Sequence, residues 1–190
     1  MKIKYLALLL ILTSCGVQSI PTAKNEVDAK FAEVQNQYKR RMDLIPNLVN
    51  VVKGYASHEK ETLTAVVEAR AKATKVNINA GNLTADQVNQ FQKAQGALSS
   101  ALSKLMLVVE RYPDLKANQN FRDLQAQLEG TENRITVARN RYIEAIKGFN
   151  NLVTVPPTSW TNSLMYHHEK MPQFQVENLQ EAQNAPTIEF

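Results

Sequence analysis

Residues 121–152 have the sequence FRDLQAQLEGTENRITVARNRYIEAIKGFNNL. Apolar or small side chains recur in this stretch at steps of three and four residues: Phe121, Leu124, Leu128, Thr131, Ile135, Ala138, Tyr142, Ala145, Phe149 and Leu152. An average spacing of about 3.5 residues is typical of helices that pack against one another along their length. The stretch therefore predicts one long helix, which Pro156 and Pro157 end because proline interrupts helical hydrogen bonding.

The same spacing occurs twice more, over residues 27–76 and 88–112. No stretch alternates polar and apolar residues for long enough to indicate a sheet. The predicted fold is all-α, an antiparallel up-and-down bundle of three long helices with an irregular C-terminal tail. The tail carries several aromatic side chains, so we expect it to pack on the bundle: Trp160, Tyr166, Phe174 and Phe190.

Turn and cap signals separate the three helices. Residues 77–84 (NINAGNLT) have a turn composition, and Thr84 with Gln87 three residues later matches a capping box. Pro113 ends the second helix, since the residue before a proline disfavours helical geometry. Asn118 is then a suitable N-cap for the third helix.

Pro46 conflicts with the first helix, because an interior proline costs about 3 kcal/mol. The heptad phase continues without a slip from residue 27 to residue 76, which favours a kinked helix. The alternative is a chain reversal near Asp43, with Pro46 in the first turn of a new helix. That alternative converts three long helices into four.

Composition excludes several classes of protein. The chain has 190 residues, which suits one domain, and its single cysteine rules out a disulfide scaffold and a cysteine-based zinc site. The formal net charge is +4, and it falls to +2 if a leader containing Lys2 and Lys4 is removed. So small an excess of positive charge gives no strong electrostatic field to attract nucleic acid.

The N-terminus has the features of an export signal. A basic start precedes the apolar run YLALLLIL at residues 5–12, which is shorter than the roughly 20 residues that a membrane-spanning helix needs. The following residues, Leu-Thr-Ser-Cys-Gly at 12–16, resemble the lipobox of bacterial lipoproteins. Cys15 is therefore the predicted lipidation site, to be acylated with chains such as palmitate.

These signals divide the chain into four expected segments: a lipoprotein signal peptide at 1–14, a lipidated tether at 15–24, the helical bundle at 25–155 and the tail at 156–190. Anchoring through Cys15 predicts a membrane-attached protein of the bacterial cell envelope. Gly16 follows the cysteine, and this favours the periplasmic face of the outer membrane if the host is Gram-negative.

Three stretches together resemble the LemA family. They are residues 38–63 (YKRRMDLIPNLVNVVKGYASHEKETL), 98–121 (LSSALSKLMLVVERYPDLKANQNF) and 124–142 (LQAQLEGTENRITVARNRY). The resemblance implies a membrane-attached antiparallel helical bundle and gives no catalytic residues to carry over. Members are often encoded near membrane metalloproteases or other envelope proteins, which implies an envelope role. This chain differs from most members in having a lipobox in place of an N-terminal transmembrane helix.

The sequence holds no convincing set of catalytic or metal-binding residues. His167, His168 and Glu169 are adjacent and lack the helical spacing of a metal site, and the serines at 99, 100 and 103 lack a nucleophile elbow. No glycine-rich loop is present to bind phosphate. We therefore expect no enzyme activity, no metal and no cofactor.

Hairpin arithmetic predicts two layers of polar residues. Reversals near residues 80 and 115 would place residue n opposite 160 − n in the first hairpin and opposite 230 − n in the second. One layer would contain His58, Glu59, Ser99, Thr131, Glu132 and Asn133. The other would bring Arg40, Arg41 and Asp43 beside Asp114, together with Glu110 and Lys116. Such layers either fix helix register or form a partner or ligand site.

The expected function is that of a lipid-anchored, non-catalytic envelope protein acting as a structural or protein-interaction module. Its expected partners are the membrane, through Cys15, and an envelope protein whose identity the sequence does not give. The alternative is a lipoprotein that binds a small ligand or is an accessory to an envelope protease.

Overall fold

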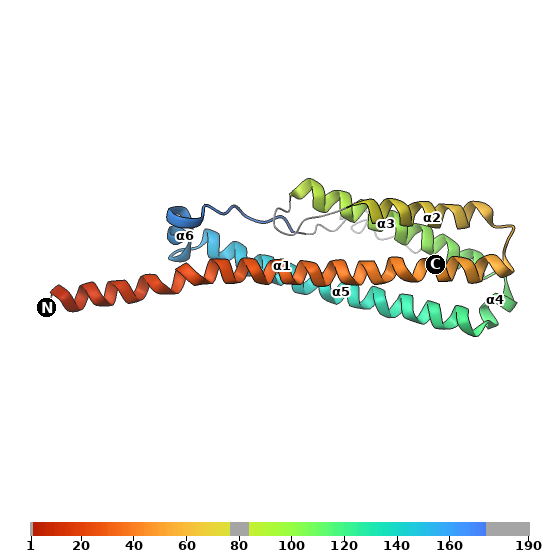
Figure 1. The fold of residues 1–190 in the computed structure, drawn as a ribbon, viewed down its shortest axis with the longest axis horizontal. Coiled ribbons are helices and arrows are strands. Elements are labelled where there is room, and N and C mark those ends of the chain that lie inside the picture. The colour runs from red at the N-terminus through yellow and green to blue at the C-terminus, as the bar shows by residue number, and fades with distance from the viewer. Residues whose placement is uncertain (1, 77–83, 174–190) are drawn as a thin grey trace, which may run out of the picture.

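A computed structural model describes residues 2–76 and 84–173, with side chains from residue 17 onward, and this part of the chain is helical without a strand (Figure 1). The long helices are α1 (Lys2–Tyr55), α2 (Lys60–Lys75), α3 (Ala85–Val109) and α5 (Gln119–Thr154). The short ones are α4 (Pro113–Ala117), α6 (Thr158–Thr161) and the π-helix η2 (Asn162–Tyr166). The predicted all-α bundle is confirmed.

Helix α1 runs the length of the molecule and sets its rod shape (Figure 1). Its 54 residues extend about 81 Å at 1.5 Å per residue. Helix α5 lies antiparallel to α1, while α2 and α3 pack beside the C-terminal half of α1 (Figure 1). The rod therefore has a four-helix end and a two-helix end.

The register between α1 and α5 is constant along the rod. The Phe31 and Tyr142 rings lie 5.2 Å apart, and the Arg141 Nη1 atom is 2.7 Å from Glu33 Oε1. Further along, Arg41 Nη1 is 2.6 Å from the Oε1 atom of Glu132. The residue numbers of each pair sum to 173 or 174, so residue n of α1 lies opposite residue 173 − n or 174 − n of α5.

The predicted first helix is wrong in one respect, because the chain reverses at residues 56–59. Helix α1 ends at Tyr55 and α2 begins at Lys60, with Glu59 N donating to the carbonyl of Ala56 at 3.1 Å. The heptad phase misled the prediction because the short turn leaves the apolar spacing unchanged on both sides. Residues 53–61 (KGYASHEKE) are largely polar and small, which is the local signal for this turn.

Helix α1 continues through Pro46, so the alternative reversal near Asp43 is also wrong. Proline has no N–H, and Pro46 therefore leaves the carbonyl of Met42 without its helical donor. Arg70 of α2 supplies a replacement, since its Nε donates to the Met42 carbonyl oxygen at 2.8 Å. The antiparallel packing of α2 on α1 thus compensates the lost backbone bond.

Two groups of buried apolar side chains fill the rod. The four-helix core includes Ile45, Leu48 and Val52 of α1 and joins residues of α2, α3 and α5. The two-helix core includes residues 27–38 of α1 and the C-terminal half of α5, and the start of α3 reaches it through Phe91. The Phe91 and Tyr38 rings pack at right angles with 4.9 Å between their centroids.

The predicted helix caps are confirmed. Thr84 Oγ1 accepts from the Gln87 backbone N at 3.2 Å and the Gln87 side chain accepts from the Thr84 N at 3.1 Å, forming the capping box of α3. Asn118 caps α5 by accepting from the Phe121 N at 3.0 Å. The predicted turn at 77–84 lies, except for Thr84, outside the described residues.

The described part of the tail folds back onto the bundle. After α5 ends at Thr154, α6 and η2 turn the chain, and Asn162 Oδ1 accepts from the His168 backbone N at 3.0 Å. Asn150 of α5 bonds both the N and the O of Met171, at 2.8 and 3.1 Å. Residues 158–173 are therefore an integral part of the two-helix end. Phe174 and Phe190 lie outside the described residues.

Candidate functional site

A layer of buried polar side chains lies between the two cores. Arg41 of α1, Gln95 of α3 and Thr131 of α5 are all buried. Each occupies a heptad position with apolar neighbours before and after it, as Arg41 does between Tyr38 and Ile45. Polar residues at such positions restrict which helices and registers can pair. The layer therefore fixes how α3 and α5 align on α1.

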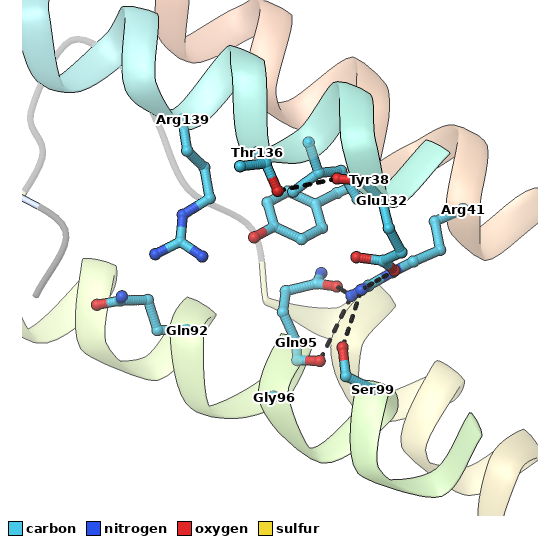
Figure 2. Close-up of a pocket in the computed structure, with 10 residues that line it drawn as sticks. Tyr38, Arg41, Gln92, Gln95, Gly96, Ser99, Glu132, Thr136 and Arg139 are labelled. Carbon is cyan, nitrogen blue, oxygen red and sulfur yellow. Dashed lines mark hydrogen bonds and ion pairs between the residues drawn. The ribbon is translucent and has the colours of Figure 1, made fainter. Parts of the chain in front are cut away.

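Arg41 is the centre of this layer (Figure 2). Its Nη1 donates to Glu132 Oε1 at 2.6 Å and to Ser99 Oγ at 3.0 Å. Its Nη2 donates to the Gln95 backbone oxygen at 3.4 Å and also to the Gln95 side-chain oxygen. The guanidinium additionally lies over the Tyr38 ring, 5.0 Å from the centroid. One side chain thus connects three long helices.

The positive charge of Arg41 has to be paired because it is buried. Arg41 is 1% exposed, and an unpaired guanidinium in an apolar interior costs several kcal/mol. Glu132 neutralises it from a side chain that stays 48% exposed, so the carboxylate keeps part of its hydration. The pair is therefore one-sided, with a buried cation and a half-solvated anion.

The layer still has unused hydrogen-bond donors. In the part of the chain that the structure describes, the Nε of Arg41 and the Nε2 of Gln95 are buried without a hydrogen-bond partner. Buried donors are nearly always satisfied in folded proteins, and an unsatisfied one costs about 1–3 kcal/mol. An acceptor oxygen is the group that these two donors lack.

A pocket of about 440 Å³ opens beside this layer, between α1, α3 and α5 (Figure 2). Its lining consists of Tyr38, Arg41, Gln92, Gln95, Gly96, Ser99, Glu132, Ile135, Thr136 and Arg139. Two arginines and one glutamate give this lining a net positive charge. The pocket therefore suits a ligand group that is anionic and accepts hydrogen bonds, and a carboxylate has both properties.

Electrostatics in the pocket follow from the same residues. Burial raises the pKa of the Tyr38 hydroxyl above its ordinary value, while the Arg139 and Arg41 guanidiniums partly offset that rise. Tyr38 consequently stays protonated at neutral pH and remains a neutral wall of the pocket.

A second hollow, of about 330 Å³, lies on α3 and α5 and shares Ser99 and Glu132 with the first. It is lined mainly by Leu102, Ser103, Met106, Gln125, Leu128 and Glu129.

Four of the predicted site residues lie in this layer. Arg41, Ser99 and Glu132 are in direct contact, although the sequence arithmetic placed Arg41 in a different layer from the other two. The second hairpin was placed correctly, since Ser99 and Glu132 sum to 231 against the predicted 230. Thr131 is buried in the same layer, where its hydroxyl donates to the Gln127 carbonyl at 2.7 Å.

The other predicted residues on α1, α4 and α5 lie away from the pocket lining. Asn133 and Arg40 are exposed, and Asp43 pairs with Lys39 at 3.3 Å on the surface of α1. Asp114 is exposed in the first turn of α4. The predicted grouping of Arg40, Arg41 and Asp43 with Asp114 is therefore wrong.

Glu59 lies at the far tip of the four-helix end. Its Oε1 accepts from Arg111 Nη2 at 2.9 Å and from the Tyr112 hydroxyl at 3.0 Å, and this hydrogen bond raises the pKa of Tyr112. Arg111 is twelve residues beyond Ser99, or about 18 Å along a helix. His58 is exposed in the same turn. The predicted layer of His58 and Glu59 with Ser99 and Thr131 is therefore wrong.

The two errors have different causes. A reversal near residue 80 was expected to be the first, so α1 and α2 were treated as one helix. The actual turn at 56–59 brings Arg41 level with Ser99 and Glu132, and leaves Glu59 at the tip. Glu59 and Arg111 sum to 170, not 160, so the offset of the α2–α3 hairpin was also wrong.

The sequence reasoning missed Gln95, Tyr38, Gln92 and Arg139 as pocket residues. Gln95 carried a usable signal, because it is a polar residue at an apolar position of its heptad series, as are Arg41 and Thr131. Gln92 and Arg139 carried none, since polar residues on a helix surface are ordinary. Within residues 2–76 and 84–173, no three His, Cys, Asp or Glu side chains are placed to hold a metal ion.

Comparison with known proteins finds one matching family model and several relatives. The family model described as LemA family matches residues 30–190. Protein LemA of Metamycoplasma hominis is 24% identical over 139 residues, covering 73% of this chain and 58% of that protein. Magnetosome protein MamQ 2 of Paramagnetospirillum magneticum is 23% identical over 158 residues, covering 73% and 57%. Magnetosome protein MamQ of Magnetospirillum gryphiswaldense is 22% identical over 174 residues, covering 78% and 63%. This chain spans less than two thirds of the length of each.

Proposed function

Because this chain belongs to the LemA family, we propose that it is a lipid-anchored, non-catalytic binding module of the bacterial cell envelope. Its binding site is the pocket beside Arg41, which takes a carboxylate side chain from a partner protein. The observation that carries this proposal is an open pocket of about 440 Å³ whose lining holds two guanidiniums, those of Arg41 and Arg139, and one carboxylate, that of Glu132.

The chemistry of the pocket favours binding over catalysis. The Oγ atom of Ser99 accepts a hydrogen bond from the positively charged Arg41, which is not the general base that an activated serine nucleophile needs. The three histidines, His58, His167 and His168, lie outside the pocket lining. What the lining offers is hydrogen-bond donors and positive charge, and these recognise an anion without transforming it.

Attachment to the membrane rests on the N-terminal sequence. The apolar run at 5–12 and the Leu-Thr-Ser-Cys signature support acylation of Cys15 and anchoring through the acyl chains. Within the described residues, no helix is long and apolar enough to cross a bilayer. Metabolic labelling with a palmitate analogue tests this part. Wild-type protein takes up label and Cys15→Ala does not, whereas label retained in the variant contradicts the anchor.

Photocrosslinking in intact cells tests the binding site. Thr136 and Thr154 are exposed threonines of α5 that each donate to the carbonyl four residues earlier, so they are matched in structure. Thr136 lines the pocket and Thr154 does not. A photoreactive amino acid at position 136 gives a discrete protein adduct, and the same group at position 154 does not. Equal adducts at both positions, or none at either, contradict the proposed site.

The alternative ligand is a small molecule with a carboxylate, which the pocket volume of about 440 Å³ favours because drug-sized sites occupy about 300–1,000 Å³. Native mass spectrometry of the detergent-solubilised protein separates the two sources. A copurifying small mass, together with no adduct at position 136, supports the small ligand. A protein adduct without that mass supports the interaction module, and an envelope protease as the adduct supports the accessory role.

A further inference from the structure

Four large apolar side chains are exposed together at the start of the tail. They are Val155 (53% exposed), Trp160 (69%), Leu164 (81%) and Met165 (54%), and we call them the tail patch. The other exposed large apolar residues in the described part of the chain are spread over α1, α2, α3 and α5: Tyr55, Val67, Leu107 and Val137. Single exposed apolar residues are ordinary, whereas a cluster within eleven residues indicates a contact surface.

The tail patch faces outward because the other side of its segment is fixed to the bundle. Asn162 is buried and its Nδ2 donates to the backbone oxygen of His168 at 2.9 Å. The Tyr166 hydroxyl donates to the Val17 carbonyl of α1 at 2.7 Å. Burying Trp160 or Leu164 against the bundle would require breaking these contacts. The patch is therefore held in an exposed orientation.

The position of the tail patch along the rod is close to that of Cys15. The register between α1 and α5 pairs residues whose numbers sum to 173 or 174. Helix α5 ends at Thr154, which this register places level with residues 19 and 20 of α1. The Tyr166 contact with Val17 agrees, since Val17 is two residues from Cys15. Figure 1 shows α6 at the end of the rod from which α1 extends to the N-terminus.

We propose that the tail patch inserts into the interfacial layer of the bilayer to which Cys15 is anchored, a proposal that rests on the proposed function. Tryptophan prefers the membrane–water interface, and neighbouring leucine and methionine side chains gain by burial in the acyl region. Acyl chains on Cys15 alone would leave the rod free to swivel. A second contact through the tail patch holds the rod at a defined angle to the membrane. An upright rod would place Arg41, 26 residues from Cys15, about 39 Å from the anchor.

The tail patch contains its own reporter, because Trp160 is the only tryptophan of the chain. The full-length acylated protein is reconstituted into phosphatidylcholine vesicles whose acyl chains are brominated near the headgroup, and into unbrominated ones. We expect Trp160 to lose more than about half of its emission in the brominated vesicles, as interfacial tryptophans lie within reach of shallow bromines. The matched control carries Trp160→Phe with Leu107→Trp, which moves the reporter to an exposed site on α3, and its emission stays unchanged.

The outcomes separate this proposal from the lipid anchor. Protein that fails to float with the vesicles contradicts anchoring through Cys15. Protein that floats while Trp160 emission is unquenched contradicts the insertion of the tail patch, including the case in which Trp160 is covered by a second copy of the chain. The variant Leu164→Ser with Met165→Ser should float, keep its helical circular dichroism and lose the quenching. Undiminished quenching in that variant contradicts a role for the patch as a unit.

Discussion

Each end of the rod contains a proline inside α1 that frees a backbone carbonyl, and a different element supplies the missing donor at each end. Helix α1 contains two interior prolines, Pro21 in the two-helix end and Pro46 in the four-helix end. Each frees the carbonyl four residues earlier. At the four-helix end, Arg70 of α2 donates to the Met42 carbonyl at 2.8 Å. At the two-helix end, the Tyr166 hydroxyl donates to the Val17 carbonyl at 2.7 Å.

The difference shows what each end depends on. The four-helix end is completed by α2, which follows α1 directly after a short turn. The two-helix end is completed by η2, which is 149 residues away from Val17 in sequence. Its stability therefore depends on the tail docking, whereas the four-helix end can form from neighbouring hairpins. The layer around Arg41 lies where the two ends meet.

The largest effect is expected at that layer. Arg41→Ala removes the charge that joins α1, α3 and α5, leaves Gln95 and Ser99 without their partner and opens a cavity. We expect a loss of about 2–4 kcal/mol in the free energy of unfolding. Denaturant unfolding followed by circular dichroism measures it. Arg40→Ala is the matched control, because Arg40 is exposed on the next position, and should change stability by less than about 0.5 kcal/mol. Equal effects would contradict a structural role for the layer.

An effect of intermediate size on the free energy of unfolding is expected for the side chains that donate to the freed carbonyls at the two ends. Tyr166→Phe leaves the Val17 carbonyl without a donor and should cost about 1–2 kcal/mol. Pro21→Ala restores the backbone N–H, so Tyr166→Phe in that background should cost much less. The corresponding cycle of Arg70→Met with Pro46→Ala tests the other end. Denaturant unfolding of the single and double variants gives the coupling energy. Additive effects would show that the two side chains do not compensate the prolines.

The smallest effect concerns alkaline pH and is absent at neutral pH. Burial raises the pKa of Tyr142 well above its ordinary value in the two-helix core. The stability that this neutral hydroxyl contributes is fully present below its unfolded-state pKa of about 10 and is lost as the pH rises through the folded-state value. Tyr142→Phe should therefore flatten the fall in melting temperature above pH 10. An unchanged alkaline profile would contradict the burial of that hydroxyl.

The fold was largely predictable because heptad spacing and cap residues are local signals. The capping box of Thr84 and the cap by Asn118 follow from short sequence motifs. The turn at 56–59 was missed because it preserves the heptad phase. Tyr166 and Arg70 supply donors to the carbonyls that Pro21 and Pro46 free inside α1, and no local pattern reveals such distant donors.

The candidate site was predicted only in part. Arg41, Ser99 and Glu132 were all singled out as polar candidates, but their contact depended on the register that the missed turn changed. Gln95 was recognisable as a polar residue in an apolar series. Arg139 and Gln92 contribute to the pocket through the packing of α3 and α5, which the sequence of either helix alone does not determine.

If the pocket beside Arg41 binds a carboxylate, the arginine Nε–H resonances of the ¹⁵N-labelled protein report the binding directly. Acetate serves as the probe, with chloride at equal ionic strength as the control. We expect a saturable shift of the Arg41 Nε–H resonance with acetate and none with chloride. Arg141, whose guanidinium pairs with Glu33 on the surface, should show no saturable shift. An Arg41 resonance that is indifferent to acetate, or that shifts equally with chloride, would contradict a carboxylate site in the pocket.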